Sequence, residues 1–241
     1  MFHFFVPALT FPETVITGED VSHIRNVLRM KPGDALEVSD GTACFLAEIT
    51  ELSPDAVRVR LRKEQAGAEL PVPVTVFQGL PKSDKLETII QKCTELGAVR
   101  IVPVEMHRSI VKIDAKKKAA RQSRWQGIAE SAAKQSRRTV IPQISEAVSF
   151  ADALRQSGAL EVQLLCYEHA RGMEQTRQVL GSLRPSETVG LWIGPEGGFE
   201  NSEVEALTHA GAQVITLGRR ILRTETAGPA VLAMLTYLME P

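Results

Sequence analysis

The sequence predicts an α/β domain preceded by a small, mostly β domain. From about residue 72 onward, short apolar runs alternate with helical patterns, which is typical of a parallel sheet covered by helices. Residues 1 to about 64 instead contain short strands and one helix. The stretch 63–71 between them is polar and closed by a proline, as linkers often are. We therefore expect two domains, residues 1–70 and residues 71–241.

In the first domain, runs of apolar and β-branched residues predict strands. These runs are 2–6, 35–39, 42–50 and 56–61. Asp40-Gly41 is a hairpin-turn pair. Asp20 can cap a helix over 21–28, and Pro32-Gly33-Asp34 then turns the chain back. A compact β module with one helix is common among proteins that grip RNA, although shape alone does not define a function.

In the second domain, strands and helices are expected in alternation. The strands are 72–77, 100–104, 162–166, 189–193 and 213–217, and the helices are 84–96, 150–156, 202–210 and one that starts at Thr224. Gly97 closes the first of these helices. This order predicts a parallel sheet, in which loops at the carboxyl ends of the strands form the ligand-binding edge.

Charge is informative only locally. The 241 residues carry a net charge of -1, so the whole-chain charge gives no support for nucleic-acid binding. The segment 107–138, however, contains ten basic residues and only two acidic ones. Such a local excess creates a positive field over part of the surface. The alternative is an ordinary helix whose lysines and arginines point into water.

Several classes of protein are disfavoured. The N-terminal residues lack the basic flank and long apolar run of a secretory signal, and the longest apolar stretch, 231–239, is too short to span a bilayer. Cys44, Cys93 and Cys166 lie far apart, without close histidines, so neither a disulfide framework nor a metal site is expected. We expect a cytoplasmic protein without a metal.

A glycine-rich turn follows one predicted strand, in Leu191-Trp192-Ile193-Gly194-Pro195-Glu196-Gly197-Gly198-Phe199. Its three glycines let backbone groups approach a ligand closely, and its proline restricts the loop. The spacing matches neither a phosphate-binding loop nor a dinucleotide fingerprint, so those ligands are disfavoured. A simple turn is the alternative interpretation.

An arginine-rich loop follows another strand, in Leu217-Gly218-Arg219-Arg220-Ile221-Leu222-Arg223-Thr224-Glu225-Thr226-Ala227. A capped helix with water-facing arginines would explain Thr224 and Glu225. It would not explain three arginines beside a glycine-rich loop. A third strand end, Leu164-Leu165-Cys166-Tyr167-Glu168, carries little information by itself.

Together these segments resemble the bacterial ribosomal RNA small-subunit methyltransferase E family of the SPOUT superfamily. The resemblance rests on Ile193 to Phe199 with Glu203, and on Leu217-Gly218 with Ile221 to Ala227. It extends, in order, over most of the chain. The upstream matches are His23, Val27-Leu28-Arg29, Gly33-Asp34, Pro81-Lys82, Ile89 to Lys92, Thr94 to Gly97, Arg108-Ser109 and Gln135-Ser136 with Arg138.

The resemblance implies an N-terminal PUA-like β-barrel and a SPOUT-type parallel-sheet domain with a deep trefoil knot. It also implies a homodimer that takes S-adenosylmethionine as methyl donor. The expected reaction is methylation of N3 of one uridine in 16S ribosomal RNA, with the assembled small subunit as the expected partner. The residues alone do not distinguish free RNA from the subunit.

The resemblance also implies roles for particular residues. The donor would lie against Leu165, Ile193, Gly194, Pro195, Glu196, Gly197, Leu217, Gly218 and Leu222. Because uridine N3 must lose a proton, Arg223 is expected to stabilise the uridine anion. Glu225 or Glu196 would act as a base only if it faced the uracil, and the alternative for Glu225 is a carboxylate that stabilises a helix N-terminus. RNA contacts are expected from Arg25, Arg29, Arg108, Gln135 and Arg138.

Two positions depart from the usual family pattern. Lys134 lies where an acidic residue is common, and Ser83 lies where glycine is frequent. Two other functions stay open: a SPOUT enzyme that methylates another acceptor, such as a ribose 2'-hydroxyl or a transfer-RNA guanine, and an RNA-binding assembly factor that lacks the chemistry.

Overall fold

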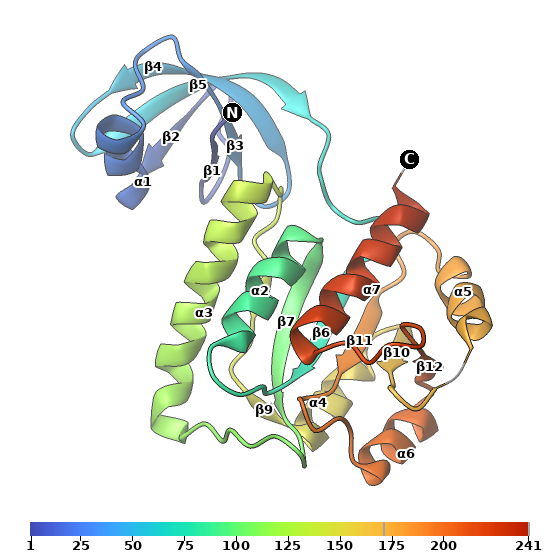
Figure 1. Ribbon diagram of the computed structural model, residues 1–241. Helices are drawn as coiled ribbons and strands as arrows, with labels where there is room; N and C mark the ends of the chain where they lie inside the picture. Colours follow the sequence, from blue (N-terminus) through green and yellow to red (C-terminus); the bar gives the residue numbers. More distant parts are fainter. Residues whose placement is uncertain (171, 241) are drawn as a thin grey trace. The chain divides into compact units, whose positions relative to one another are not determined.

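The computed structural model describes residues 1–170 and 172–240, which form two compact units (Figure 1). The first unit contains Met1–Glu69 and also Ala133–Ile141. The second contains Leu70–Ala132 and the chain from Pro142 onward. The last turn of a long helix therefore belongs to the small N-terminal unit, which no local sequence pattern indicates.

The first unit is a five-stranded sheet of order β1-β3-β4-β5-β2, antiparallel except where β1 pairs with β3. Its elements are β1 (His3–Phe5), β2 (Glu13–Thr17), α1 (Glu19–Ser22), the π-helical turn η1 (His23–Val27), β3 (Ala35–Ser39), β4 (Cys44–Leu52) and β5 (Ala56–Gln65). Alternate strand residues such as Leu36, Ile49 and Val57 are fully buried. The predicted hairpin at Asp40-Gly41 is confirmed. Strand β2 was not predicted, because its five residues begin with a charge and contain only two large apolar side chains.

The predicted helix cap in this unit was wrong. The helix begins with Gly18 at the N-cap, where φ is 76°, and Asp20 lies inside the first turn. The Asp20 carboxylate accepts hydrogen bonds from Lys134 Nζ at 2.9 and 3.0 Å. Lys134, which departs from the family pattern, is therefore the ion-pair partner of Asp20 within one unit.

The second unit confirms the predicted α/β domain. All its strand pairs are parallel, in the order β12-β10-β11-β6-β7-β8, and β9 also pairs with β7. The strands are β6 (Val74–Gly79), β7 (Ala98–Glu105), β8 (Gln143–Ile144), β9 (Val148–Ser149), β10 (Val162–Cys166), β11 (Val189–Ile193) and β12 (Gln213–Ile215). The helices are α2 (Lys85–Glu95), α3 (Ala115–Ser136), α4 (Phe150–Ser157), α5 (Met173–Gly181), α6 (Asn201–His209) and α7 (Thr224–Met239).

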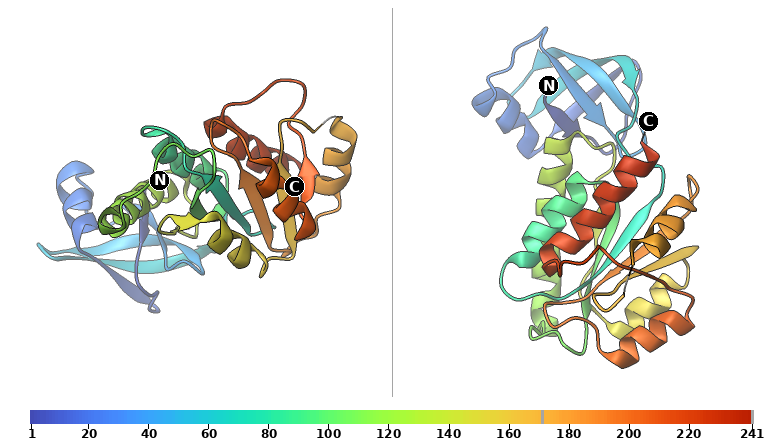
Figure 2. Two further views of the ribbon diagram at one scale, coloured as in Figure 1. Left: turned by 90° about the horizontal axis from the view of Figure 1, so that it is seen from below. Right: turned by 45° about the vertical axis from the view of Figure 1, so that its right-hand side comes forward.

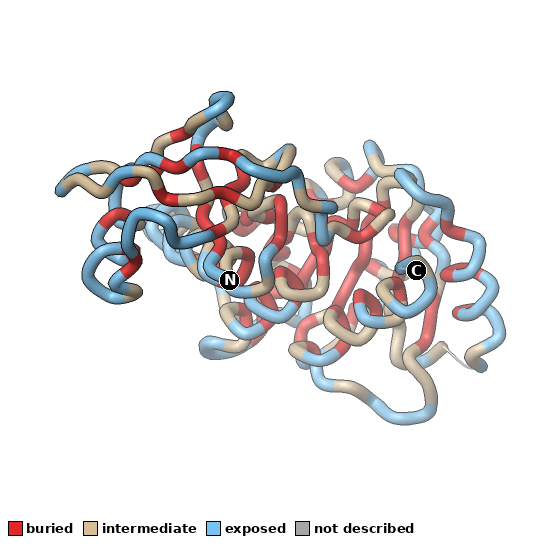
Figure 3. Tube along the Cα trace, turned by 90° about the horizontal axis from the view of Figure 1, so that it is seen from above, coloured by how far each residue is buried: buried red, intermediate tan, exposed pale blue. Residues whose placement is uncertain are grey.

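Helices cover both faces of this sheet because successive strand residues point to opposite sides. Leu164 and Leu191 pack in the cluster that includes side chains of α2, α5 and α7, whereas Leu165 and Trp192 pack against residues of α4 and α6. Figure 2 shows α2 and α7 side by side along one face. In Figure 3 the sheet strands are largely buried and the outer helices are partly exposed.

After the edge strand β12, the chain returns across the sheet. Strand β10 lies between β12 and β11 in the sheet. Helix α7, which follows β12 in the chain, nevertheless contacts β11 and α2. No helix among residues 1–170 and 172–240 has both the length and the apolar character needed to cross a bilayer.

Candidate active site

The three segments selected from the sequence leave the same edge of the parallel sheet. Strands β12, β10 and β11 are neighbours and parallel, so their carboxyl ends lie together. The backbone N–H of Tyr167 donates to the carbonyl of Ile215 at 3.0 Å, which joins two of the strand ends. The Thr224 hydroxyl donates to the carbonyl of Gly194 at 2.7 Å. The glycine-rich loop and the arginine-rich loop are therefore in direct contact.

A buried glutamine supports the contact between Thr224 and Gly194. Gln78, at the end of β6, has no exposed surface, and its Nε2 donates to Thr224 Oγ1 at 2.8 Å and to the Gly79 carbonyl at 2.9 Å. A buried amide with specified partners holds the start of α7 in one position. Sequence reasoning missed Gln78. The available signal was a polar residue near the end of an otherwise apolar strand.

At the three glycines of the first loop, an added side chain would crowd neighbouring residues. Gly198 has φ 70°, and a Cβ there would lie 2.1 Å from Glu168 Oε1. A Cβ on Gly194 would lie 3.2 Å from the Phe199 ring, and one on Gly197 would lie 3.0 Å from Arg108 Cβ. The loop therefore folds tightly against its neighbours, as close backbone approach demands.

Gly218 in the second loop differs. Its φ of 102° favours glycine, but no described atom lies within 4 Å of the position that its Cβ would take. The residue is half-buried, and the following Arg219 and Arg220 are exposed. There is consequently open space beside a backbone turn that favours glycine, next to the strand ends. A ligand approaching the backbone here fits the residues present.

Three charged side chains form an ion cluster beside these loops. Lys85 Nζ lies 2.9 Å from Glu196 Oε1 and 3.5 Å from Glu225 Oε2. Burial acts to raise the pKa of Glu196, but hydrogen bonds from Lys85 and from the backbone N–H of Lys82 hold that pKa below its usual range. The hydrogen bond to Glu196 raises the pKa of Lys85. Glu196 is therefore an anion paired with a cation, which makes it a weak proton acceptor.

Arg223 is positioned differently from these acids. It is the N-cap residue of α7, its side chain is 81% exposed, and its Nη1 lies 3.9 Å from Glu225 Oε1. A guanidinium held this loosely can turn toward a bound anion. Glu225 lies in the first helical turn, where a carboxylate interacts favourably with the helix dipole.

Arg108 supports the glycine-rich loop. Its Nε donates to Glu200 Oε2 at 2.9 Å and its Nη1 donates to the Gly197 carbonyl at 3.1 Å. The bond to Glu200 raises the pKa of Arg108. Glu200 and Glu203 form a capping box at the start of α6, and Glu203 also accepts from the backbone N–H of His107 at 2.8 Å. The predicted RNA contact would require Arg108 to share its guanidinium with these partners.

The apolar residues expected around the donor are unequally accessible. Leu165 and Ile193 are buried in the core on opposite faces of the sheet, at 0% and 2% exposure. Leu217 and Leu222 are half-buried. Pro195 is buried, and the adjacent Glu196 is exposed. Leu165 is thus a core residue here, packed in the cluster with Trp192 and with residues of α4 and α6.

The expected RNA contacts fall into two groups. Arg25, Arg29 and Gln135 are exposed. Arg138 is only 1% exposed, and its guanidinium binds the carboxylate of Glu69. The same carboxylate accepts backbone N–H groups from residues 139 and 140 at 3.0 and 3.1 Å. The structure therefore argues against a phosphate contact by Arg138 and assigns it a structural role.

We also searched the described residues for side chains that could bind a metal ion. No group of three or more His, Cys, Asp or Glu side chains among them could hold a metal ion, and the three cysteines are free.

Comparisons with known proteins define the class. Residues 68–236 match the family model of an RNA methyltransferase domain, and residues 16–62 match that of an RNA methyltransferase PUA domain. The chain thus has the fold and the domain pair of an RNA methyltransferase. The ribosomal RNA small subunit methyltransferase E of Bacillus subtilis is 37% identical over 236 residues, which cover 95% of this chain and 91% of that protein. The chain belongs to the ribosomal RNA small subunit methyltransferase E family.

Solved structures agree. The Neisseria gonorrhoeae enzyme of that name, bound to S-adenosylmethionine, is 30% identical with a TM-score of 0.83, and the match covers 99% of this chain and 98% of that chain. A methyltransferase of Legionella pneumophila with the same bound cofactor is 29% identical with a TM-score of 0.83, covering 98% and 97% of the two chains.

Proposed function

We propose that the chain transfers a methyl group from S-adenosylmethionine to N3 of one uridine in small-subunit ribosomal RNA. The observation that carries this proposal is the hydrogen bond between Thr224 and Gly194. It locks the glycine-rich loop to the loop that carries Arg223. In a family whose solved relative is bound to S-adenosylmethionine, that locked pair supplies both a donor site and a charged group for the acceptor.

The donor would bind mainly through backbone groups of the two loops. Open space beside Gly218 and half-buried Leu217 and Leu222 suit the adenosine part of the donor. Gly194, Pro195, Glu196 and Gly197, together with Ile193 at the strand end, would shape the opposite wall. Methyl transfer then depends on holding the acceptor atom in line with the breaking bond, which can supply a large part of the rate.

Arg223 is proposed as the catalytic residue. Uridine N3 must lose its proton, and negative charge then spreads to O2 and O4. A mobile guanidinium stabilises that charge without itself changing protonation. Glu225 faces Lys85 and the helix N-terminus, so we assign it to the positioning of this cluster and not to proton removal.

RNA would be held through phosphates by Arg25, Arg29 and Gln135 of the first unit and by Arg108 of the second. The target uridine must be unpaired or flipped, because its N3 is covered in a helix. In this proposal the reaction takes place in the cytoplasm, on RNA within the small subunit.

We further propose that the active form is a homodimer. Val231, Leu232 and Leu235 of α7 are fully buried in their own core, but Tyr237 and Leu238 are 87% and 49% exposed near the end of the helix. Exposed large apolar groups at a helix end favour a partner surface. Light scattering of the purified chain should give twice the mass of one chain.

The proposed activity is tested by incubating the purified chain with labelled S-adenosylmethionine and ribosomal subunits that lack the modification. Label should enter small subunits and not large ones. Transfer to large subunits alone, or none at all with intact donor binding, would contradict the proposal.

A further inference from the structure

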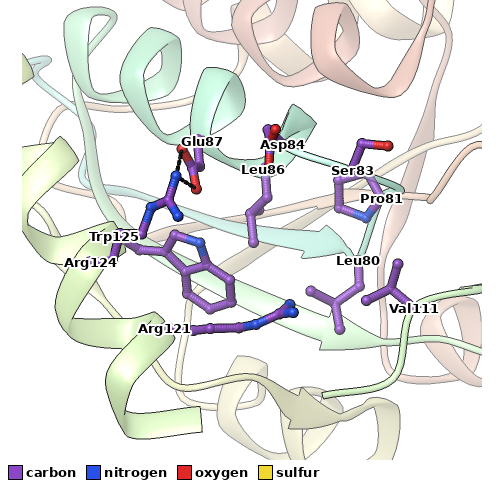
Figure 4. A pocket seen from close by; sticks show the side chains of 10 residues that line it. All are labelled: Leu80, Pro81, Ser83, Asp84, Leu86, Glu87, Val111, Arg121, Arg124 and Trp125. Atoms are coloured by element: carbon purple, nitrogen blue, oxygen red, sulfur yellow. Dashed lines mark hydrogen bonds and ion pairs between the residues drawn. The ribbon is translucent and has the colours of Figure 1, made fainter. Parts of the chain in front are cut away.

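A cavity of about 250 Å³ lies in the second unit between the β6–α2 loop and helix α3 (Figure 4). Its apolar walls are Leu80, Leu86, Val111 and the ring of Trp125. Polar side chains surround these walls. They are Ser83, Asp84, Glu87, Arg121 and Arg124. None of the donor-loop residues named above lines this cavity.

Two arginines of α3 have different roles in the cavity. Arg124 Nη2 lies 2.9 Å from Glu87 Oε1, so its charge is already neutralised. Arg121 is exposed, and no hydrogen bond or ion pair to it occurs among the described residues. In Figure 4 its side chain extends across the cavity below Trp125, with the guanidinium toward Leu80 and Val111. The cavity is thus lined by an aromatic ring and by a planar cation for which no protein partner is described.

This combination suits a single nucleobase. The cavity is smaller than the pockets that enclose drug-sized ligands, but it offers a flat apolar wall, a guanidinium that can stack or donate, and carboxylates that can accept. Arginine and aromatic side chains are the groups on which unpaired bases stack. A phosphate alone would not need the apolar walls.

The cavity adjoins the candidate active site through one loop. Pro81 lines the cavity, and the backbone N–H of the next residue, Lys82, donates to Glu196 of the glycine-rich loop at 3.1 Å. Lys85 directly precedes Leu86 and Glu87, which line the cavity, and its Nζ donates to the same Glu196 carboxylate. The loop therefore has the cavity on one side and the donor loops on the other.

We propose that this cavity binds the base of an unpaired nucleotide that flanks the methylated uridine, with Arg121 as the principal contact. The inference rests on the proposed function, because it takes RNA as the substrate. Occupation of the cavity would hold the neighbouring nucleotide on one side of the β6–α2 loop while the target base reaches the donor loops on the other. Arg121 is thus an RNA-binding residue and not a catalytic one.

Trp125 provides a direct readout. The chain has two tryptophans: Trp125 is 5% exposed and lines the cavity, whereas Trp192 has no exposed surface and is stacked on Phe77. Titration with single-stranded oligouridylate or oligocytidylate of about ten nucleotides should quench Trp125 fluorescence saturably. Arg121→Gln should weaken binding about tenfold, which is typical for the loss of one stacking contact. Arg121→Lys, which keeps the charge but loses the planar group, should recover only part of the affinity.

The matched control is Arg177→Gln, which makes the same change at an exposed arginine of α5 outside the cavity and should leave the quenching unchanged. If Arg121→Gln and Arg121→Lys both bind like the wild type, or if RNA binds without altering Trp125 fluorescence, the proposal is overturned.

Methyl transfer to small subunits, measured on the same proteins, separates this inference from the proposed function. Arg121→Gln should raise KM for the subunit about tenfold and leave donor affinity unchanged. Active wild type with an unaltered KM in the variant would overturn the cavity assignment alone. Saturable quenching without any methylation would support the cavity and contradict the proposed function.

Discussion

Gly198 and Arg223 illustrate two kinds of residue in the candidate active site. Gly198 has a φ of 70°, which favours glycine, and a Cβ there would lie 2.1 Å from Glu168 Oε1, so the Glu168 side chain would have to move. Arg223 is loosely held, since its side chain is 81% exposed and its Nη1 lies 3.9 Å from Glu225 Oε1. The first shapes a rigid binding surface, and the second can move onto a charge that forms during the reaction.

Gly198→Ala should weaken donor binding at least about tenfold, because strain in the left-handed region costs about 1–2 kcal/mol and the methyl group would also displace Glu168. Calorimetric titration with S-adenosylmethionine measures this change. Gly181→Ala, in α5 with no described atom within 4 Å of the added methyl, is the control and should leave the affinity intact. Equal affinity for the Gly198 variant and the wild type would show that the loop does not hold the donor.

Arg223→Ala should lower kcat by about a hundredfold or more, as is typical when a group that stabilises a developing anion is removed, and should change donor affinity little. Single-turnover methyl transfer separates these effects. Arg220→Ala in the same exposed loop serves as the control for lost charge. An unchanged rate for the Arg223 variant would remove this residue from the catalytic group.

At the scale of elements, two connections in the first unit depend on one carboxylate each. The turn between β3 and β4 is closed by Asp40, which accepts hydrogen bonds from the Thr42 hydroxyl at 2.7 Å and from the backbone N–H groups of Thr42 and Ala43. The end of α3 is held by Glu69, which binds Arg138. Neither carboxylate belongs to the candidate active site, so we expect that removing either carboxylate or its partner lowers stability.

Asp40→Ala should destabilise the first unit at neutral pH by about 1–2 kcal/mol, because local hydrogen bonds to a charged carboxylate are lost. The Thr42 hydroxyl and backbone N–H groups lower the pKa of Asp40 from 3.8 to about 2. A lowered carboxyl pKa stabilises the folded state above about pH 4, and the effect is lost as the pH falls through about 2. Urea unfolding at pH 7 and near pH 2.5 should show the difference shrinking. Asp55→Ala, at an exposed aspartate of the next turn, is the control and should leave the free energy of unfolding unchanged at pH 7.

Arg138→Ala should lower the free energy of unfolding by about 2–4 kcal/mol, because it leaves a carboxylate without its buried cation. Thermal unfolding measures the loss. Arg25→Ala, at an exposed position, should instead leave stability unchanged and weaken RNA binding with a smaller salt slope. If the Arg138 variant were fully stable but bound RNA poorly, the phosphate contact expected from the sequence would be reinstated.

At the scale of the whole molecule, regular patterns were readable and long-range pairings were not. Strands β10 and β11 have the predicted bounds, because parallel strands are apolar along their whole length. Helix α5 was missed, and α3 was recognised only as the ordinary alternative to an RNA-binding segment. The partners of Gln78, Lys85 and Arg138 are separated from them by 69 to 146 residues, so no local pattern could reveal them. The donor loops could be selected because glycine and arginine follow strand ends. Their contact through Thr224 required the fold.

The most direct test of the central claim is mass mapping of the nucleoside that the purified chain produces on small ribosomal subunits lacking the modification. The account predicts that the transferred label is recovered as N3-methyluridine at one position, with Arg223→Ala giving the same product more slowly. Label recovered on a ribose 2'-hydroxyl or on a guanine would contradict the proposed acceptor, although the fold and the donor loops would stand.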